Sequence, residues 1–435
     1  MINITENDIS LEEWVNKMAN TYEFGIVYSV LMPAYQKVTK SIGKEIESFR
    51  HIQYTIEDEN KKADGTWKPE VWDVYDTRWL KLVTGAKRRY NMLFNKLNGV
   101  SLRFGRSFDE KDDPTWCGLG PELLDLEVSV NGCPKIGGEN CRFCYKGNTD
   151  APPTNMTFDN FKVIVSRFPK TLCQIPLGIT GLKTNPDLEH MLRHIQDELL
   201  IPPTLTLSGK DLDDHMANVI AECCSGCAVS CYEGHKDMCY QAVELLHSKR
   251  NGLHVNMHLV LGDVTMGHCM DVLKDVADGV VPSCRNVVFL TMKPKGRAAA
   301  LDCSLSLDNI RKVVQFCKEY QIKFGFDTCH VDDIRRVLDE KGAANPEVFC
   351  ERCESSRFSS YVNVRGEYHH CSFAEGMVPN PTVISSLDGV CGFIDWWRNG
   401  KDIIALRNPE NPASRGCQFF KTTVDANRGY HVELP

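Results

Sequence analysis

The sequence has no long apolar run and no excess of positive charge. Nowhere in its 435 residues does an apolar stretch approach the roughly 20 residues of a membrane-spanning helix, which excludes a helical membrane protein. The start, Met-Ile-Asn-Ile-Thr-Glu-Asn, is neither basic nor apolar, so we expect no secretory signal and a cytoplasmic protein. The formal net charge of −8 disfavours a general affinity for nucleic acid. Internal repeats and low-complexity tracts are also absent, and the length suits one large domain or two to three smaller ones.

One segment departs from the acidic balance. Residues 78–106 contain eight basic residues and no acid, and an acidic run at residues 109–113 follows directly. Two interpretations stand: a solvated helix face that the acidic run neutralises, or a surface that docks an acidic partner. The eight basic residues are Arg78, Lys81, Lys87, Arg88, Arg89, Lys96, Arg103 and Arg106.

Hydrophobic periodicity changes near residue 120. Apolar residues at helical spacing over residues 11–18 and 27–49 predict a mainly helical N-terminal region, with a polar loop over residues 58–66. From residue 123, short apolar strands alternate with helices, which is typical of βα units around a parallel sheet. We expect strands at residues 125–130, 174–179, 204–207, 227–230, 254–261 and 286–292. We expect helices near residues 157–168, 187–199, 213–223, 237–249, 266–277 and 306–320.

Six such units favour an open (β/α)6 partial barrel of the α/β class over a closed eight-stranded barrel. We therefore predict three segments: a helical region over residues 1–120, the barrel over residues 121–322, and a small C-terminal domain over residues 323–435. In such barrels the chemistry takes place at the carboxyl ends of the strands.

Cysteine is abundant, with 20 residues. Without a secretory signal, these cysteines are better interpreted as reduced thiols and metal ligands than as disulfides. Cys133, Cys141 and Cys144 follow the first expected strand as Cys-x7-Cys-x2-Cys. A [4Fe-4S] cluster takes four thiolates, so three from one loop leave one iron open to a substrate or cofactor. Zinc is the alternative, although this loop offers only one Cys-x2-Cys pair and a distant single cysteine.

This loop, with Tyr145 directly after it, resembles the cluster loop of radical SAM enzymes, commonly Cys-x3-Cys-x2-Cys-aromatic. The first gap is four residues longer here and contains Gly137 and Gly138, which permit additional backbone turns. The resemblance extends over residues 123 to about 330. It implies that the open iron binds S-adenosylmethionine, which is cleaved reductively to a 5′-deoxyadenosyl radical.

Later motifs follow in the family's order. Residues 177–187, Leu-Gly-Ile-Thr-Gly-Leu-Lys-Thr-Asn-Pro-Asp, are similar to the Gly-Gly-Glu-Pro segment that receives the cofactor's amino group, although the Glu is missing. Residues 206–209 and 229–234 resemble the family's third and fourth strand ends. Residues 294–298 resemble the Pro-x-Gly-Arg of peptide-modifying members. The cofactor-binding residues that the resemblance implies are Tyr145, Gly178, Ile179, Thr180, Gly181, Ser208, Ser230 and His258.

A second cysteine set lies beyond the barrel and consists of Cys329, Cys350, Cys353 and Cys371. Four thiolates complete one cubane. The order of the set resembles the shortened SPASM or twitch extension, which implies an auxiliary [4Fe-4S] cluster that transfers electrons. A four-thiolate zinc site is the alternative. Cys391 and Cys417 lack close partners in the sequence, and the flanking histidines are expected to be solvated or to lie behind the ligands. These histidines are His330, His369 and His370.

Among the other thiols, Cys231 follows the fourth strand directly, and we predict it as a catalytic hydrogen-atom donor, with simple core packing as the alternative. The resemblance implies an enzyme that abstracts hydrogen from a peptide or protein substrate. A small-molecule or nucleotide substrate, and a zinc-stabilised binding protein without activity, are the alternatives. The expected partners are the peptide or protein and a small reductant protein such as flavodoxin or ferredoxin, with no membrane and no nucleic acid.

Overall fold

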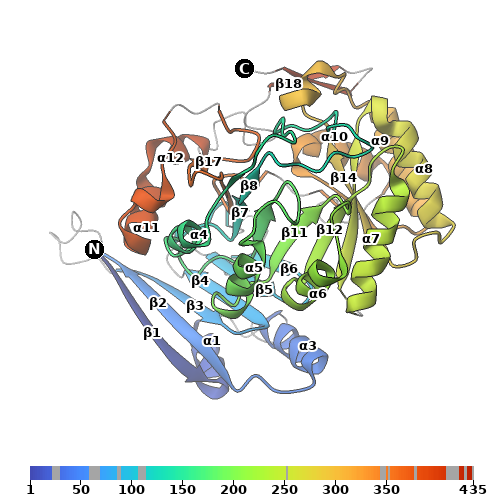
Figure 1. Cartoon of the computed structure of the whole chain (residues 1–435). Coiled ribbons are helices and arrows are strands. Elements are labelled where there is room, and N and C mark those ends of the chain that lie inside the picture. Colours follow the sequence, from blue (N-terminus) through green and yellow to red (C-terminus); the bar gives the residue numbers. More distant parts are fainter. Residues whose placement is uncertain are drawn as a thin grey trace.

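The computed structural model describes most of the chain and contains two large sheets (Figure 1). One is a six-stranded N-terminal sheet and the other a nine-stranded sheet that forms the open barrel. The described residues are 1–21, 30–57, 69–85, 90–105, 114–250, 253–342, 349–350, 353–376, 380–407, 421–425 and 429–433.

The N-terminal sheet is an antiparallel meander in the order β1 to β6. Its strands are β1 (Ile2–Ser10), β2 (Ser48–Ile56), β3 (Glu70–Asp76), β4 (Leu80–Gly85), β5 (Tyr90–Asn95) and β6 (Val100–Phe104). Helices α1 (Leu11–Thr21) and α3 (Met32–Ile42) connect β1 to β2. Helix α1 begins with a capping box, in which the Glu13 N–H donates to Ser10 Oγ (3.2 Å) and the Ser10 N–H donates to Glu13 Oε2 (2.8 Å).

The prediction of a mainly helical N-terminal region is therefore wrong. The helix expected over residues 11–18 is confirmed in α1. Within the described part of the expected 27–49 helix, residues 32–42 form α3 and β2 begins at Ser48. The physical reason is a two-residue alternation in the first part of β3: Trp72 and Val74 are fully buried, while Val71 and Asp73 are partly exposed. The loop expected at residues 58–66 lies outside the described residues.

The basic segment is part of this sheet and not a solvated helix face. Lys81 and Lys96 are buried, and their Nζ atoms lie 3.3 Å and 2.6 Å from the carboxylate of Asp76. Arg103 pairs with Glu122 at 2.8 Å and with Glu354. These three cations stabilise the interior and offer no docking surface. Outside the described residues lie Lys87, Arg88, Arg89, Arg106 and the acidic run 109–113.

The predicted (β/α)6 barrel is confirmed. Its parallel strands, in spatial order, are β7 (Leu123–Glu127), β10 (Ile175–Gly178), β11 (Pro203–Leu207), β12 (Gly226–Ser230), β13 (His254–Leu261) and β14 (Asn286–Thr291). The helices are α4 (Phe158–Val165), α5 (Leu188–Asp197), α6 (Asp214–Cys223), α7 (Lys236–Lys249), α8 (Met266–Ala277) and α9 (Leu307–Glu319). Figure 1 shows α5 to α9 on the outer side of these strands.

The C-terminal segment continues the barrel sheet on both sides. Strand β15 (Phe324–Phe326) adds parallel to β14, and β16 (Ser359–Val362) adds parallel to β7, with β17 (Tyr368–His369) antiparallel beyond it. The remaining elements are β8 (Ser129–Val130), β9 (Thr154–Asn155), α10 (Val331–Glu340), α11 (Gly389–Asn399), α12 (Lys401–Arg407), β18 (Lys421–Asp425) and β19 (Gly429–Glu433). The segment boundaries at residues 120 and 322 stay a prediction.

The side chains of β7 alternate between the core and the barrel interior. Leu124 and Leu126 are fully buried in the core that also holds the outer helices. Asp125 and Glu127, on the opposite face, line a cavity inside the barrel. This alternation positions the candidate site. Among the described residues, no helix combines the length and the apolar character needed to cross a membrane.

Candidate functional site

A cavity of about 820 Å³ occupies the barrel interior, and the first cysteine set lies in its wall. Polar and small side chains at the strand ends complete the lining. The residues predicted from the sequence that line it are Cys133, Cys141, Cys144, Tyr145, Gly178, Ile179, Thr180, Gly181, Ser208, Ser230 and His258. The structure thus brings all eight predicted cofactor-binding residues and the first three predicted metal ligands to one cavity.

The cysteine loop depends on glycines. Gly137 and Gly138 adopt positive φ angles of 61° and 86°, and a side chain at Gly137 would come within 2.4 Å of the His235 ring. Gly296 also has a positive φ of 60°, and a Cβ there would lie 2.4 Å from the carbonyl oxygen of Cys144. The loop is therefore folded tightly against a second backbone segment.

Arg297 holds this loop from the carboxyl end of the barrel. Its Nε donates to the carbonyl oxygen of Cys141 at 2.8 Å, and its backbone N–H donates to that of Cys144 at 3.0 Å. Arg297 and Gly296 belong to the Pro-Lys-Gly-Arg segment noticed in the sequence. That segment therefore supports the cysteine loop.

The three thiols lie close enough to affect each other's ionisation. Burial raises the pKa of Cys133, the Cys144 thiol raises it further, and Arg297 opposes both. Burial likewise raises the pKa of Cys141 to about 11. Thiolates in such a place need a cation to stabilise them, because burial penalises the charged form. A donor set of three mutually close thiols that line a cavity fits an iron–sulfur cluster with one open iron.

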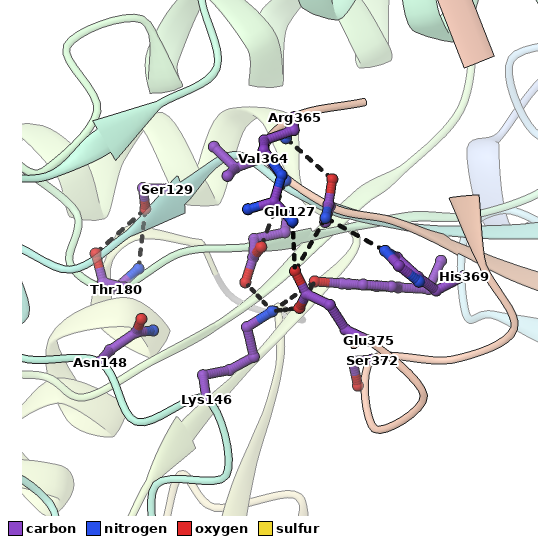
Figure 2. A network of polar contacts seen from close by, with 12 residues as sticks. Glu127, Ser129, Lys146, Asn148, Thr180, Val364, Arg365, His369, Ser372 and Glu375 are labelled. Carbon is purple, nitrogen blue, oxygen red and sulfur yellow. Dashed lines mark hydrogen bonds and ion pairs between the residues drawn. The ribbon is translucent and has the colours of Figure 1, made fainter. Parts of the chain in front are cut away.

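The segment after β10 approaches the strand before the cysteine loop closely. The Thr180 N–H donates to Ser129 Oγ at 3.0 Å (Figure 2), and Thr180 Oγ1 donates to the carbonyl oxygen of Asn131 at 2.6 Å. At Gly181, a Cβ would come within 2.8 Å of Asp211 Oδ2, and at Gly178 a Cβ would lie 3.2 Å from the Cα of Glu127. A side chain at either position would come too close to these neighbouring atoms. Glycine avoids the contact and leaves the backbone atoms of the cavity wall accessible.

His258 and Tyr145 shape the apolar part of the cavity. Burial lowers the pKa of His258 to about 4, so its ring is neutral, and its Nδ1 has no hydrogen-bond partner in the described part of the chain. Burial raises the pKa of Tyr145, whose ring packs against Phe373 with 4.5 Å between centroids. Tyr145 therefore connects the first cysteine loop to the C-terminal segment.

Cys231 does not line the cavity. Ser230 does, and the next side chain in an extended strand points to the opposite face. Cys231 is 4% exposed and packs in the core, where it interacts with the Cys239 thiol of α7 and with His268 of α8. Cys231 is therefore not among the residues that line the barrel cavity, and its role as a hydrogen-atom donor stays a prediction.

The second cysteine set surrounds a neighbouring cavity of about 540 Å³. Cys329, Cys353 and Cys371 line it, and the buried Cys350 donates from Sγ to the carbonyl oxygen of Asp327 at 3.2 Å. The Asp327 side chain in turn accepts from the backbone N–H of Cys329 at 3.3 Å. The four thiols of Cys329, Cys350, Cys353 and Cys371 match in number the four ligands of a cubane.

The three flanking histidines are buried, so a solvated position for them is wrong. Burial lowers the pKa of His330 and of His370 to about 4, which keeps both rings neutral.

Cys391 is exposed, and Cys417 lies outside the described residues. In the described part of the chain, no three His, Cys, Asp or Glu side chains are close enough to hold a single metal ion.

The two cavities meet at shared wall residues. These are Leu123, Asp125, Phe143, Tyr145, Val260 and Leu290. A molecule bound between the two cysteine sets therefore contacts a mostly apolar wall that contains one carboxyl group, Asp125.

A buried ionic network ties the two sets together, and sequence reasoning missed it (Figure 2). Lys146, two residues after Cys144, lies 2.8 Å from Glu127 Oε1, donates to Tyr361 OH at 2.9 Å and pairs with Glu375. Glu375 Oε1 accepts from Asn363 Nδ2 at 2.9 Å. The sequence does contain a signal for this network: Asp125 and Glu127 interrupt an otherwise apolar strand. Because side chains alternate along a strand, both acids are expected to face the barrel interior.

The chain matches no family model and no curated protein. Among solved structures, its fold is similar to that of SuiB from Streptococcus suis bound to precursor peptide SuiA, with a TM-score of 0.58 and 11% identity over 76% of this chain and 91% of SuiB. SuiB bound to S-adenosylmethionine gives a TM-score of 0.57, again with 11% identity, 76% and 91% coverage. The likeness to SuiB confirms the predicted fold class and the resemblance in fold.

Proposed function

We propose that the protein is a radical SAM enzyme that abstracts a hydrogen atom from a peptide or protein substrate. The observation that carries the proposal is the meeting of Cys133, Cys141 and Cys144 with the glycine-rich segment after β10 in one barrel cavity. Three thiols leave one iron of a cubane open, and that segment supplies backbone atoms beside it. The SuiB fold, whose solved forms bind S-adenosylmethionine and a precursor peptide, supports the same function.

The chain's own residues position the cofactors and exclude water. When bound, the [4Fe-4S] cluster and S-adenosylmethionine supply a 5′-deoxyadenosyl radical. Gly178 to Gly181 and Ser230 orient the cofactor's polar groups, and the neutral His258 adds no charge beside it. The apolar wall that includes Leu290 and Val260 excludes solvent from a reactive intermediate.

The second cysteine set extends the proposal to an auxiliary [4Fe-4S] cluster that exchanges electrons with the substrate. Its cavity opens onto the first at Asp125 and Tyr145. Four cysteine ligands leave no iron open to substrate, which favours electron transfer over direct binding. A peptide side chain that enters the combined cavity reaches both sets. We further propose a cytoplasmic location and a flavodoxin or ferredoxin as the reductant.

Metal analysis tests this function first. Anaerobically purified protein should contain about eight irons and eight sulfides per chain, as two cubanes require. With dithionite, it should cleave S-adenosylmethionine to 5′-deoxyadenosine. Zinc without sulfide would instead identify a zinc-stabilised binding protein and exclude the enzyme.

Variants then separate the two sites. Replacing Cys350 and Cys353 by Ala should remove about half of the iron but retain cleavage of S-adenosylmethionine, because the first set is intact. The exposed Cys391 provides the matched control, since Cys391→Ala should retain all the iron. Full iron content in the double variant would exclude an auxiliary cluster.

The substrate class has its own assay. Peptides from cells grown in deuterated medium serve as the probe, and 5′-deoxyadenosine that gains one mass unit reports abstraction from a peptide carbon. A parallel pool of deuterated small metabolites distinguishes peptides from other substrates. Deuterium transfer only from the metabolite pool would contradict the peptide proposal.

A further inference from the structure

Asp125 occupies a particular place in the barrel. It is in β7, on the face opposite the core residues Leu124 and Leu126, and it lines both cavities. A substrate that lies between the two cysteine sets therefore passes this carboxyl group.

The carboxyl group of Asp125 makes no hydrogen bond or ion pair within the described residues, whereas the charged groups near it are engaged. Lys146, the nearby cation, is held by Glu127, Glu375 and Tyr361. The side chain of Asp125 is half-buried and faces the cavities, so its carboxyl group can bind a molecule that lies there. Its position is explained if a bound molecule supplies the missing partner.

The surroundings keep Asp125 ready to exchange a proton near neutral pH. Burial raises its pKa to about 7, the charge of Glu127 raises it further, and Lys146 opposes both. The groups that face Asp125 are Glu127 on its own strand, Tyr145 and Lys146 from the cysteine loop, and Tyr361 of β16. Burial raises the pKa of both tyrosines, so they stay neutral and do not compete for the proton.

We propose that Asp125 is a catalytic residue that accepts the proton released when the substrate radical is oxidised. This inference rests on the proposed function. The substrate C–H bond gives its hydrogen atom to the 5′-deoxyadenosyl radical, which forms 5′-deoxyadenosine. An iron–sulfur cluster held by the second cysteine set would accept the one electron that the carbon radical loses. A neighbouring N–H, O–H or S–H group loses its proton to Asp125 and forms a new bond to that carbon.

The substrate class follows from this balance. It is a peptide whose attacked carbon lies beside, or within reach of, a heteroatom that carries a proton, and the product is lighter by two hydrogens. The charge of Glu127 raises the pKa of Asp125, but Glu127 does not accept the substrate's proton itself. Glu127 is therefore a positioning residue.

The first measurement needs no turnover. Infrared titration of the holoenzyme, as the difference between wild type and Asp125→Asn, should show a carboxyl band that disappears with a midpoint near pH 7. Glu127→Gln should move this midpoint to lower pH, because the Glu127 charge raises it. Asp159→Asn, at an exposed acid, is the matched control and should leave the band unchanged. A midpoint near pH 4, the range of an ordinary Asp side chain, would overturn the proposal.

The second measurement uses the deuterated peptide pool. Asp125→Asn should still transfer deuterium to 5′-deoxyadenosine. It should form the two-hydrogen-lighter peptide at least roughly 100-fold more slowly than wild type, the usual range for loss of an acid–base group. Asp125→Glu, which keeps the carboxyl group, should recover part of the product. Product formation at the wild-type rate in Asp125→Asn, or loss of deuterium transfer together with product, overturns the inference. Failure of the wild type to transfer deuterium would instead reject the proposed function.

Discussion

Lys146 is the residue whose removal tests the buried network most directly. Its side chain is 10% exposed, and those of Glu127 and Glu375 are 7% and 19% exposed. Lys146→Met keeps the apolar stem but leaves two buried carboxylates without their cation. Removing one partner of a buried pair is destabilising by about 3–5 kcal/mol. The exposed pair of Lys162 with Asp159 offers the control, since such pairs contribute about 0.2–1 kcal/mol.

The expected change in melting temperature follows from the size of the chain. With an unfolding entropy of about 2.1 cal/mol/K per residue, 435 residues that unfold together give roughly 1 °C for each kcal/mol. Lys146→Met should therefore melt about 3–5 °C below wild type at pH 7.5, by the same conversion. Lys162→Met should melt within about 1 °C of wild type. Calorimetry under anaerobic conditions measures both variants.

The pH dependence gives this prediction a second check. Burial alone would raise the pKa of Glu375, but the hydrogen bond and charge of Lys146 outweigh burial and hold it below its usual value. In the variant, burial prevails and the pKa in the folded state rises above that in the unfolded state. The destabilisation should then be full at neutral pH and diminish as the pH falls towards 5. Equal melting temperatures for the two lysine variants, or a gap independent of pH, would refute the reasoning.

Two further predictions concern the cysteine loop. Gly296→Ala should lower iron content and cofactor cleavage, because its Cβ would lie 2.4 Å from the Cys144 carbonyl oxygen, whereas Gly279→Ala, also at positive φ but with no atom within 4 Å, should retain both. Equal iron in the two glycine variants would show that this close approach has no role. Replacing Cys133, Cys141 and Cys144 together by Ala should leave roughly half the iron and abolish 5′-deoxyadenosine formation, as measured by iron assay and chromatography. Continued cleavage with dithionite would reject the assignment of the loop.

The barrel could be predicted because its signals are local. Each strand is a short apolar run and each helix begins soon after it, so six units followed from spacing alone. The N-terminal sheet is not predicted, because the apolar residues over 27–49 also fit a helical period. The two-residue alternation that indicates a strand lies further along the chain, around Trp72. The three-cysteine loop has its own spacing and follows the first barrel strand, and its cysteines line the cavity.

Long-range pairings explain what the sequence could not predict. Lys146 and Glu375 are 229 positions apart, and nothing local links a lysine to one distant acid among the 58 acidic residues. Cys231 follows a strand end, but Ser230 lines the cavity and Cys231 packs in the core, because a shift of one residue along an extended strand reverses the face. Lys81 and Lys96 are buried for a related reason, because the fold brings Asp76 to both of them.

The parallel pairing of β16 with β7 has a consequence for the order in which the protein assembles. Strand β7 lies between β10 and β16, and the register joins Leu123 to Ser359. During synthesis, about 230 residues must follow β7 before its second neighbour exists, and until then β7 is an open sheet edge. Closing such a distant contact is slow compared with local pairing. The loop that begins at Cys133 therefore lies beside an incomplete sheet edge until the C-terminal segment has been synthesised.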